Sequence, residues 1–280
     1  QCEGVSIVPD EPRHGEGHLY CEDGYVESKF VVCKVRNRIV YLHFTVNPGE
    51  MVGVLGDGKF AVPSLLYGFC EILSGSVCIE KAFDTLRNGY IPKDPHLFSG
   101  PLIKSLSCGR TLTEDAVISA LVKVGMDQEI ANLPLGLKTS RESWRDTFTH
   151  HQRQLLYLAA NIANRSQIVL IHFDSAQCNR KEEQIVMRRA RKHLPSSTIF
   201  ILSNRLRTVL RTEKIMVFKS GSLMEFKSTV ELLKDSSSCL NSYINVIRQR
   251  SIKKELRGSA LPNAGQQIIS KDDFNHDNSD

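Results

Sequence analysis

Residues 152–171 read QRQLLYLAANIANRSQIVLI, and this stretch decides the fold class. Its first part places apolar side chains at helical spacing as far as Ala163. Its last part, Ile168–Ile171, is an uninterrupted apolar run of strand length, which is typical of a strand buried on both faces of a parallel sheet. A helix followed by a central strand predicts an α/β protein.

The alternation of helix and strand continues on both sides of this stretch. Upstream, the pattern predicts strands over Phe30–Val35, Ile39–Val46 and Met51–Leu55, and helices over Ser64–Leu73 and Glu114–Val124. Downstream, it predicts a helix over Arg180–His193, a strand over Ser197–Leu202, a short helix over Leu206–Leu210, a hairpin of Lys214–Phe218 with Leu223–Phe226, and a helix over Ser238–Arg250.

Composition bounds the class of protein. The chain has 280 residues, 41% hydrophobic and 24% charged, which is ordinary globular usage. A net charge of +5 does not require an anionic partner, so we expect no nucleic-acid partner and a solvated face at Arg188–Lys192. No apolar run reaches the 18 residues of a membrane helix. Eight cysteines without a C-x-x-C pair indicate reduced thiols rather than a disulfide frame or a zinc site.

Three regions differ in texture. We expect residues 1–30 to be a loosely ordered lead-in, residues 31–250 to be the folded domain, and residues 251–280 to be a polar, disordered tail. The chain begins with Gln1 and carries no signal-peptide pattern, so we also expect it to be cut from a longer protein.

Four segments carry a resemblance to a known family. They are Pro48–Gly56, Ile91–Gly100, Gln152–Ala159 and Ser203–Leu206. In that order they resemble the approach to the phosphate loop, the Q-loop, the helix after the signature motif and the switch segment of ATP-binding-cassette (ABC) transporter nucleotide-binding domains. The QRQLL helix points to the multidrug-resistance-associated subfamily. The resemblance covers about residues 31–248. It implies a P-loop NTPase-like core with a mixed or parallel sheet, an antiparallel β subdomain and a helical insert at about 102–164.

The phosphate loop departs from the family pattern G-x-x-G-x-G-K-[ST]. Counted from Gly56, Lys59 and Ala61 stand where glycines belong, Val62 replaces the phosphate-binding lysine, and Pro63 replaces the magnesium-binding hydroxyl. An alternative register that starts at Gly53 keeps Gly56, Gly58 and Lys59 in place and ends at Phe60. We prefer the first, because the preceding Gly49-Glu50 and the following Ser64-Leu65-Leu66 then fall where the family has them.

The other motifs depart in the same way. Phe148-Thr149-His150-His151-Gln152 stands in place of the signature L-S-G-G-Q. His172, 20 residues after Gln152 and 32 before Asn204, falls at the magnesium-holding aspartate. Phe173 then takes the catalytic glutamate position, Lys93 the Q-loop glutamine and Asn204 the switch histidine. Asp174 is a substitute carboxylate only if both spacings shift by two residues.

The resemblance therefore implies an ATP site with altered chemistry. Its positions are Gly56, Gly58, Lys59, Ala61, Val62, Pro63, Ser64, Lys93, Thr149 and Gln152. Each lost hydrogen bond to a charged group costs about 1.5–3 kcal/mol, so we expect ATP to bind weakly and magnesium to find little support. Neither Phe173 nor Asn204 supplies the family's catalytic group, so we expect little or no ATP hydrolysis and no catalytic residue. Tyr20, Tyr25 and Phe30 are candidates for the aromatic side chain that stacks on adenine in this family.

Three functions remain open. The first is a catalytically silent domain of an exporter at the cytoplasmic face of a membrane. It would pair with a second nucleotide-binding domain and dock its insert, around Leu102–Leu137, on a transmembrane domain. The second is a weak ATPase that uses Lys59 on phosphate and Asp174 on magnesium. The third is a soluble adaptor that has kept only the fold.

Overall fold

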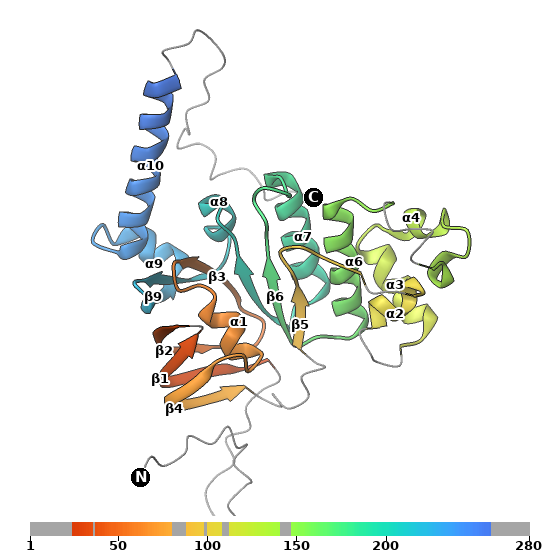
Figure 1. Ribbon diagram of the computed structural model, residues 1–280, viewed down its shortest axis with the longest axis horizontal. Coiled ribbons are helices and arrows are strands. Elements are labelled where there is room, and N and C mark those ends of the chain that lie inside the picture. The colour runs from red at the N-terminus through yellow and green to blue at the C-terminus, as the bar shows by residue number, and fades with distance from the viewer. Residues whose placement is uncertain are drawn as a thin grey trace, which may run out of the picture.

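The computed structural model describes residues 24–35, 37–79, 88–97, 100–107, 112–140 and 147–258. Its strands form one curled sheet in the order β4-β1-β2-β9-β8-β3-β7-β6-β5 (Figure 1). The strands are β1 (Val26–Val35), β2 (Arg38–Val46), β3 (Met51–Gly56), β4 (Glu71–Ile79), β5 (Asn88–Ile91), β6 (Ile168–His172), β7 (Thr198–Leu202), β8 (Lys214–Lys219) and β9 (Ser222–Ser228). This mixed α/β sheet confirms the predicted fold class.

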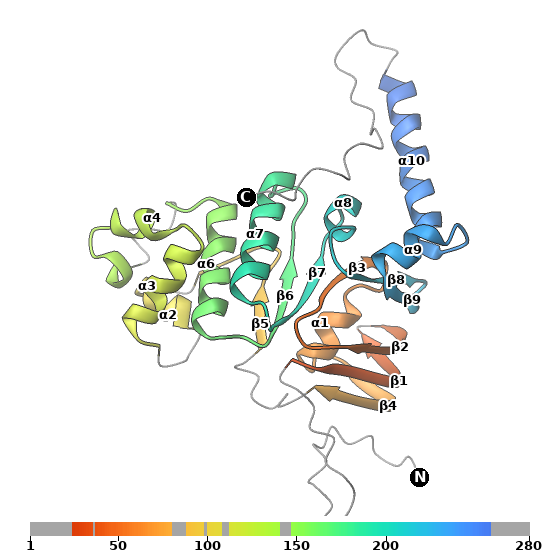
Figure 2. The same cartoon turned by 180° about the vertical axis from the view of Figure 1, so that it is seen from behind.

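Helices cover the sheet and build the insert. They are α1 (Ala61–Leu66), α2 (Leu102–Ser107), α3 (Glu114–Lys123), α4 (Asp127–Ala131), the 3-10 helix η2 (Gly136–Lys138), α6 (His150–Ala163), α7 (Arg180–His193), α8 (Leu206–Val209), α9 (Thr229–Lys234) and α10 (Cys239–Gly258). Seen from both sides, α2, α3, α4 and α6 gather beyond the β5 end of the sheet, and α10 projects from the opposite half (Figures 1 and 2).

The centre of the sheet is parallel and buried on both faces. Strands β5, β6, β7, β3 and β8 run in the same direction. Along β6, Val169 and Ile171 pack with the insert and α7, whereas Ile168 and Leu170 pack with α1 and the antiparallel strands. A side-chain period of two explains why the whole run must be apolar.

The other half of the sheet is antiparallel. Strand β1 pairs with β2 on one side and with β4 on the other, and β8 pairs with β9. Helix α1 buries Ala61, Val62, Leu65 and Leu66 against this half and against the parallel strands. The predicted antiparallel subdomain and the hairpin at Lys214–Phe218 with Leu223–Phe226 are therefore confirmed.

Two predicted helix boundaries were wrong. The helix expected over Ser64–Leu73 is α1, which ends at Leu66, because Gly68 adopts a φ of +69° and Glu71 already pairs with β1 as part of β4. At the C-terminal end, α10 continues to Gly258 rather than ending at Arg250. Strand β1 starts at Val26, inside the expected lead-in. Residues 1–23 and 259–280 lie outside the described residues, and so does Tyr20.

Candidate functional site

The segment that resembles a phosphate loop joins β3 to α1. Gly56 ends β3 with a φ of +100°, and a Cβ placed on it would lie 1.9 Å from the carbonyl oxygen of Phe218. A Cβ on Gly58 would lie 2.7 Å from Cδ1 of the same Phe218 ring. Both glycines are therefore required by the close approach of β8, whatever the loop binds.

The next residues of this segment turn into the core. Val62 is fully buried and Ala61 is nearly so, and both pack beneath the antiparallel strands. Pro63 and Ser64 are half-buried, and the Ser64 hydroxyl donates to the carbonyl of Phe60 at 2.9 Å. The side chains of Ala61 and Val62 thus contribute to packing rather than to a polar site.

Lys59 points the other way. Its ammonium donates a hydrogen bond to Oδ1 of Asn204, in the loop after β7. The side chain is only 9% exposed, and burial together with the nearby charge of Lys93 lowers the pKa of the Lys59 ammonium. The ammonium also lies 5.6 Å from the ring centroid of Phe60, within range of a cation–π contact.

Lys93, in the loop after β5, forms an ion pair with Asp174, in the loop after β6. Its ammonium lies 3.4 Å from Oδ2 of Asp174. The backbone N–H of Ala176 donates to the other oxygen of Asp174 at 3.1 Å. This hydrogen bond is the main cause that lowers the pKa of Asp174, and Lys93 adds to it. The Lys93 carbonyl in turn lies 2.9 Å from Nε2 of His150, at the start of α6.

His172 ends β6 between these groups. Its ring meets the Phe60 ring edge-on, with the centroids 5.8 Å apart. Burial lowers the pKa of His172 to about 4, and the charges of Lys59 and Lys93 act in the same direction against the weaker pull of Asp174. The imidazole is therefore neutral at pH 7. We call Lys59, Lys93, His172, Asp174 and Asn204 the polar cluster.

The structure thus brings together five residues from four separate segments of the chain, since His172 and Asp174 both lie at the end of β6. Two other predicted site positions, Thr149 and Gln152, have a structural role at the start of α6. They form a capping box, in which each side chain accepts a hydrogen bond from the backbone N–H of the other. Phe173 is 1% exposed and packs in the same core cluster as the apolar residues of the insert.

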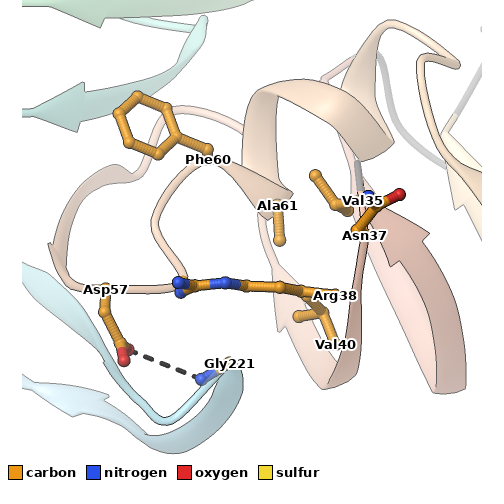
Figure 3. Close-up of a pocket in the computed structure, with 9 residues that line it drawn as sticks. Val35, Asn37, Arg38, Val40, Asp57, Phe60, Ala61 and Gly221 are labelled. Atoms are coloured by element: carbon orange, nitrogen blue, oxygen red, sulfur yellow. Dashed lines mark hydrogen bonds between the residues drawn. The ribbon is translucent and has the colours of Figure 1, made fainter.

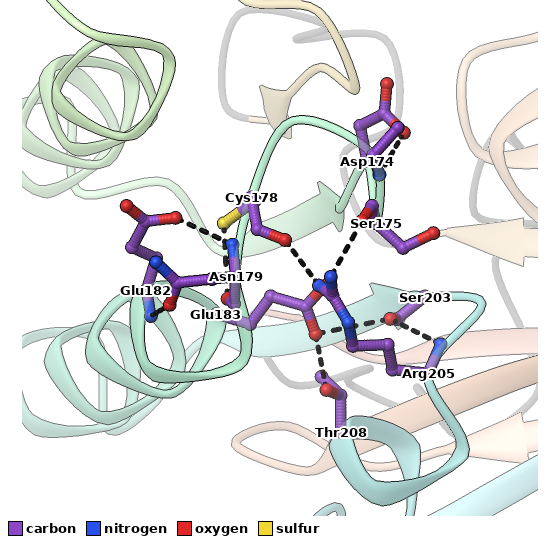
Figure 4. A network of polar contacts seen from close by, with 10 residues as sticks. Asp174, Ser175, Cys178, Asn179, Glu182, Glu183, Ser203, Arg205 and Thr208 are labelled. Carbon is purple, nitrogen blue, oxygen red and sulfur yellow. Dashed lines mark hydrogen bonds and ion pairs between the residues drawn. The ribbon is translucent and has the colours of Figure 1, made fainter. Parts of the chain in front are cut away.

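A buried ion pair, which was not predicted from the sequence, holds two loops of the polar cluster in place. Glu183 on α7 is fully buried and accepts from Arg205 at 2.5 Å, as well as from the hydroxyls of Ser203 and Thr208. Arg205 also donates to the carbonyls of Ser175 and Cys178 (Figure 4). The loop after β6, which carries Asp174, is thereby tied to the loop after β7, which carries Asn204.

A sequence signal for this pair was available. Glu183 lies three, four and seven residues before Val186, Met187 and Ala190, which form the buried face of α7. A carboxylate on the apolar face of a helix needs a buried partner.

A cavity of about 400 Å³ opens beside the segment that joins β3 to α1 (Figure 3). It is lined by Val35, Asn37, Arg38, Val40, Asp57, Gly58, Phe60, Ala61 and Gly221. The Arg38 side chain extends across it toward Asp57, whose carboxylate accepts from the backbone of Ser220 and Gly221 (Figure 3). Neither Tyr25 nor Phe30 lines the cavity. Phe30 is 75% exposed and stacks on His43, with ring centroids 4.4 Å apart.

Known proteins supply the family context. The chain is 27% identical over 251 residues to human "ATP-binding cassette sub-family C member 4", a match that covers 85% of this chain and 18% of that protein. It is 27% identical over 247 residues to rat "ATP-binding cassette sub-family C member 2", covering 82% of this chain and 15% of that protein. No protein-family model matches the chain.

The fold has a counterpart among solved structures. The "Structure of a bacterial Atm1-family ABC exporter with ATP bound" superposes with a TM-score of 0.70 at 22% identity, over 87% of this chain and 44% of that one. Sequence and fold together indicate an ABC transporter nucleotide-binding domain. The recognised resemblance to subfamily C is confirmed. The chain spans less than a fifth of the length of these subfamily C relatives.

Two further findings bear on this ABC-type domain. Among the described residues, no helix is both long enough and apolar enough to cross a bilayer. In the same part of the chain, no three His, Cys, Asp or Glu side chains gather into a group able to hold a metal ion. The polar cluster offers two ammonium groups, a neutral imidazole and an amide, but a single carboxylate, which is already paired with Lys93.

Proposed function

We propose that this chain is a degenerate, catalytically silent nucleotide-binding domain of an ABC exporter. Its role would be structural and regulatory, through pairing with a second nucleotide-binding domain and coupling to the helices of a transmembrane domain. The observation that carries the proposal is that the residues at the motif positions contact one another: Lys59 bonds Asn204, and Lys93 pairs with Asp174.

The donor set fits magnesium and triphosphate poorly. Magnesium is held by hard oxygen ligands, usually carboxylates and hydroxyls together with phosphates. The polar cluster has one carboxylate, and Asp174 is neutralised by Lys93. Where the family has the magnesium-binding hydroxyl, Pro63 has neither a hydroxyl nor a backbone N–H.

The packing also disfavours catalysis. With the phosphate loop counted from Gly56, Val62 takes the lysine position and Phe173 the catalytic glutamate position, and both side chains are buried in the core. A neutral His172 alone does not supply the ligands that magnesium needs. Asn204 bears no charge with which to sense a γ-phosphate.

The partners and the location follow from the ABC likeness and are part of the proposal. The helical insert, with α2, α3 and α4, would dock on a transmembrane domain, and the face that carries the polar cluster would meet the second nucleotide-binding domain. The chain would then lie at the cytoplasmic face of a membrane. Mixing it with a nucleotide-binding domain of a subfamily C exporter should give a complex on size-exclusion chromatography.

A weak ATPase is the second candidate. One observation favours it: Lys59 and Asp174 belong to the same polar cluster, near enough that both shift the pKa of His172. In this case the ammonium of Lys59 would leave Asn204 for a phosphate, and Asp174 would leave Lys93 for magnesium.

Titration of the purified chain with a fluorescent ATP analogue and magnesium separates the two candidates. We expect no Lys59-dependent binding up to millimolar nucleotide and no phosphate release. Micromolar, magnesium-dependent binding that Lys59→Ala abolishes would overturn the silent assignment. Lys104→Ala is the matched control, because Lys104 is an exposed lysine on α2, outside the polar cluster.

A further inference from the structure

A second cavity lies between the C-terminal ends of α3 and α7, away from the polar cluster. Its volume is about 350 Å³, and it is lined by Lys123, Ile185, Arg188, Arg189, Lys192 and His193. Lys123 comes from α3 and the other five residues from α7. We call it the basic cavity.

The side chains that line the basic cavity are mostly basic. Five of its six lining side chains are basic, and no carboxylate lines it. Within the described part of the chain, Lys123, Arg188 and Lys192 form no ion pair. Burial lowers the pKa of His193, and Lys192, Lys123 and Arg189 lower it further. These cations therefore face the same space and repel one another.

Helix capping explains only part of this cluster. Arg189 donates to the carbonyl of Val124, just after the last turn of α3, which gives it a structural role. Cations also stabilise the negative end of a helix dipole, as Lys123 and Lys192 do in their last turns. The interaction with the helix dipole fades within one turn, so it does not explain the presence of Arg188, which is exposed and lines the same cavity.

We propose that the basic cavity binds an anion that carries two or more phosphate groups. Its volume is that of a small-ligand site. Guanidinium groups bind phosphate through paired, charge-assisted hydrogen bonds, and lysines add point charge. Cations converge on one compact volume from two helices, which suits densely charged phosphates better than carboxylates spaced along a peptide. Ile185 supplies an apolar wall against which the carbon frame of such a ligand packs.

The test uses the full chain at physiological salt, with pyrophosphate and inositol hexakisphosphate as soluble probes in isothermal titration calorimetry. Vesicles that contain phosphatidylinositol bisphosphate, sedimented with the protein, form the lipid arm. Binding in the soluble arm assigns a free phosphate compound, and binding only in the vesicle arm assigns a lipid headgroup.

The double variant Arg188→Gln with Lys192→Gln should weaken binding by about tenfold or more. The matched control is Arg180→Gln with Lys181→Gln, which removes the same charge from the exposed first turn of α7, outside the cavity. Equal losses in both double variants would overturn the proposal, as would the absence of binding in both arms. So would an acidic peptide that binds as tightly as the phosphates.

This site is independent of the silent assignment. Nucleotide binding that the Arg188/Lys192 variant removes and Lys59→Ala leaves intact belongs to the basic cavity. The opposite result belongs to the polar cluster.

Discussion

Lys59 and Asn204 are 145 residues apart in the sequence, yet the Lys59 ammonium donates a hydrogen bond to the side-chain oxygen of Asn204. The contact joins the loop after β3 to the loop after β7. Two side chains of the chain therefore bridge these two segments directly.

The Lys59–Asn204 contact should stabilise the fold without nucleotide. A double-mutant cycle with Lys59→Met and Asn204→Ala should give a coupling of about 1 kcal/mol in urea unfolding, since one partner is exposed and solvent weakens the pair. The exposed pair Lys138–Glu114, 3.6 Å apart, is the control and should couple by less than about 0.5 kcal/mol. Equal coupling in the two cycles would show that the Lys59–Asn204 contact stabilises the fold no more than an exposed ion pair does.

Removal of the buried carboxylate of Glu183 should be costly. Glu183→Ala leaves the guanidinium of Arg205 without its counter-charge, so we expect a loss of about 3 kcal/mol or more in the free energy of unfolding. Glu182→Ala, which removes the neighbouring carboxylate from the cap of α7, should cost only about 1 kcal/mol. Chemical denaturation of both variants checks the difference, and similar losses would contradict it.

Acid should destabilise the domain through His172. The folded-state pKa is about 4 and the ordinary value is 6.5, so between these values the unfolded chain binds more protons. Stability is therefore full above pH 6.5 and falls as the pH drops toward 4.

We expect His172 to account for about 2 kcal/mol of this loss, less than the full shift implies because the side chain is only partly buried. Melting curves at several pH values should show a shallower acid decline for His172→Gln. His96→Gln, at an exposed histidine, should leave the decline unchanged. A decline that is the same in all three proteins would contradict the assignment.

Gly56 should be required for folding, independently of any phosphate. In Gly56→Ala the new methyl group meets the Phe218 carbonyl and the backbone keeps a φ of +100°, so we expect a loss of about 3 kcal/mol or more. Gly68→Ala is the control, since Gly68 also has a positive φ but no atom within 4 Å of the added Cβ. It should cost about 1 kcal/mol. Thermal unfolding that ranks the two variants in the opposite order would refute the steric explanation.

Cys70 should be more reactive than the buried thiols of Cys33 and Cys178. The thiol of Cys33 hydrogen-bonds to Cys70, which lowers the pKa of Cys70 and raises that of Cys33. Burial raises the pKa of Cys178 to about 12. Limited alkylation with iodoacetamide, followed by peptide mass spectrometry, should therefore label Cys70 before Cys33 and Cys178. Cys33→Ala should slow that labelling because the hydrogen bond is lost, and an unchanged rate would exclude the thiol contact.

Local pattern predicted most of the framework. The buried runs Ile168–Ile171 and Ser197–Leu202 contain the central strands, and the apolar spacing of α3 and α6 gave both helices within two residues of their ends. Ser64–Leu73 failed because its apolar residues suit a helix and a strand equally well. Glu71 pairs with Lys34 of β1, a strand distant in the sequence, and this pairing makes the segment a strand.

The candidate site divides in the same way. The motif spacings placed Lys59, Lys93, His172 and Asn204 at motif positions, and Asp174 entered only as a substitute carboxylate that breaks the spacings. The spacings could not say which side chains would bond to which. The spacings also did not predict that Val62 and Phe173 are core residues. An apolar residue at a motif position gives the same sequence pattern whether it is buried or lines a site.

By itself, then, the sequence predicted an α/β domain from its periodicity, which is a local property of the chain, and its motif segments resemble those of ABC transporter nucleotide-binding domains. The tertiary structure alone decided that Lys59 bonds Asn204, that Lys93 pairs with Asp174, and that Arg205 reaches the buried Glu183. Such pairings depend on which loop ends the parallel strands bring to the same edge of the sheet. That is set by strand order and burial, which no short stretch of sequence contains.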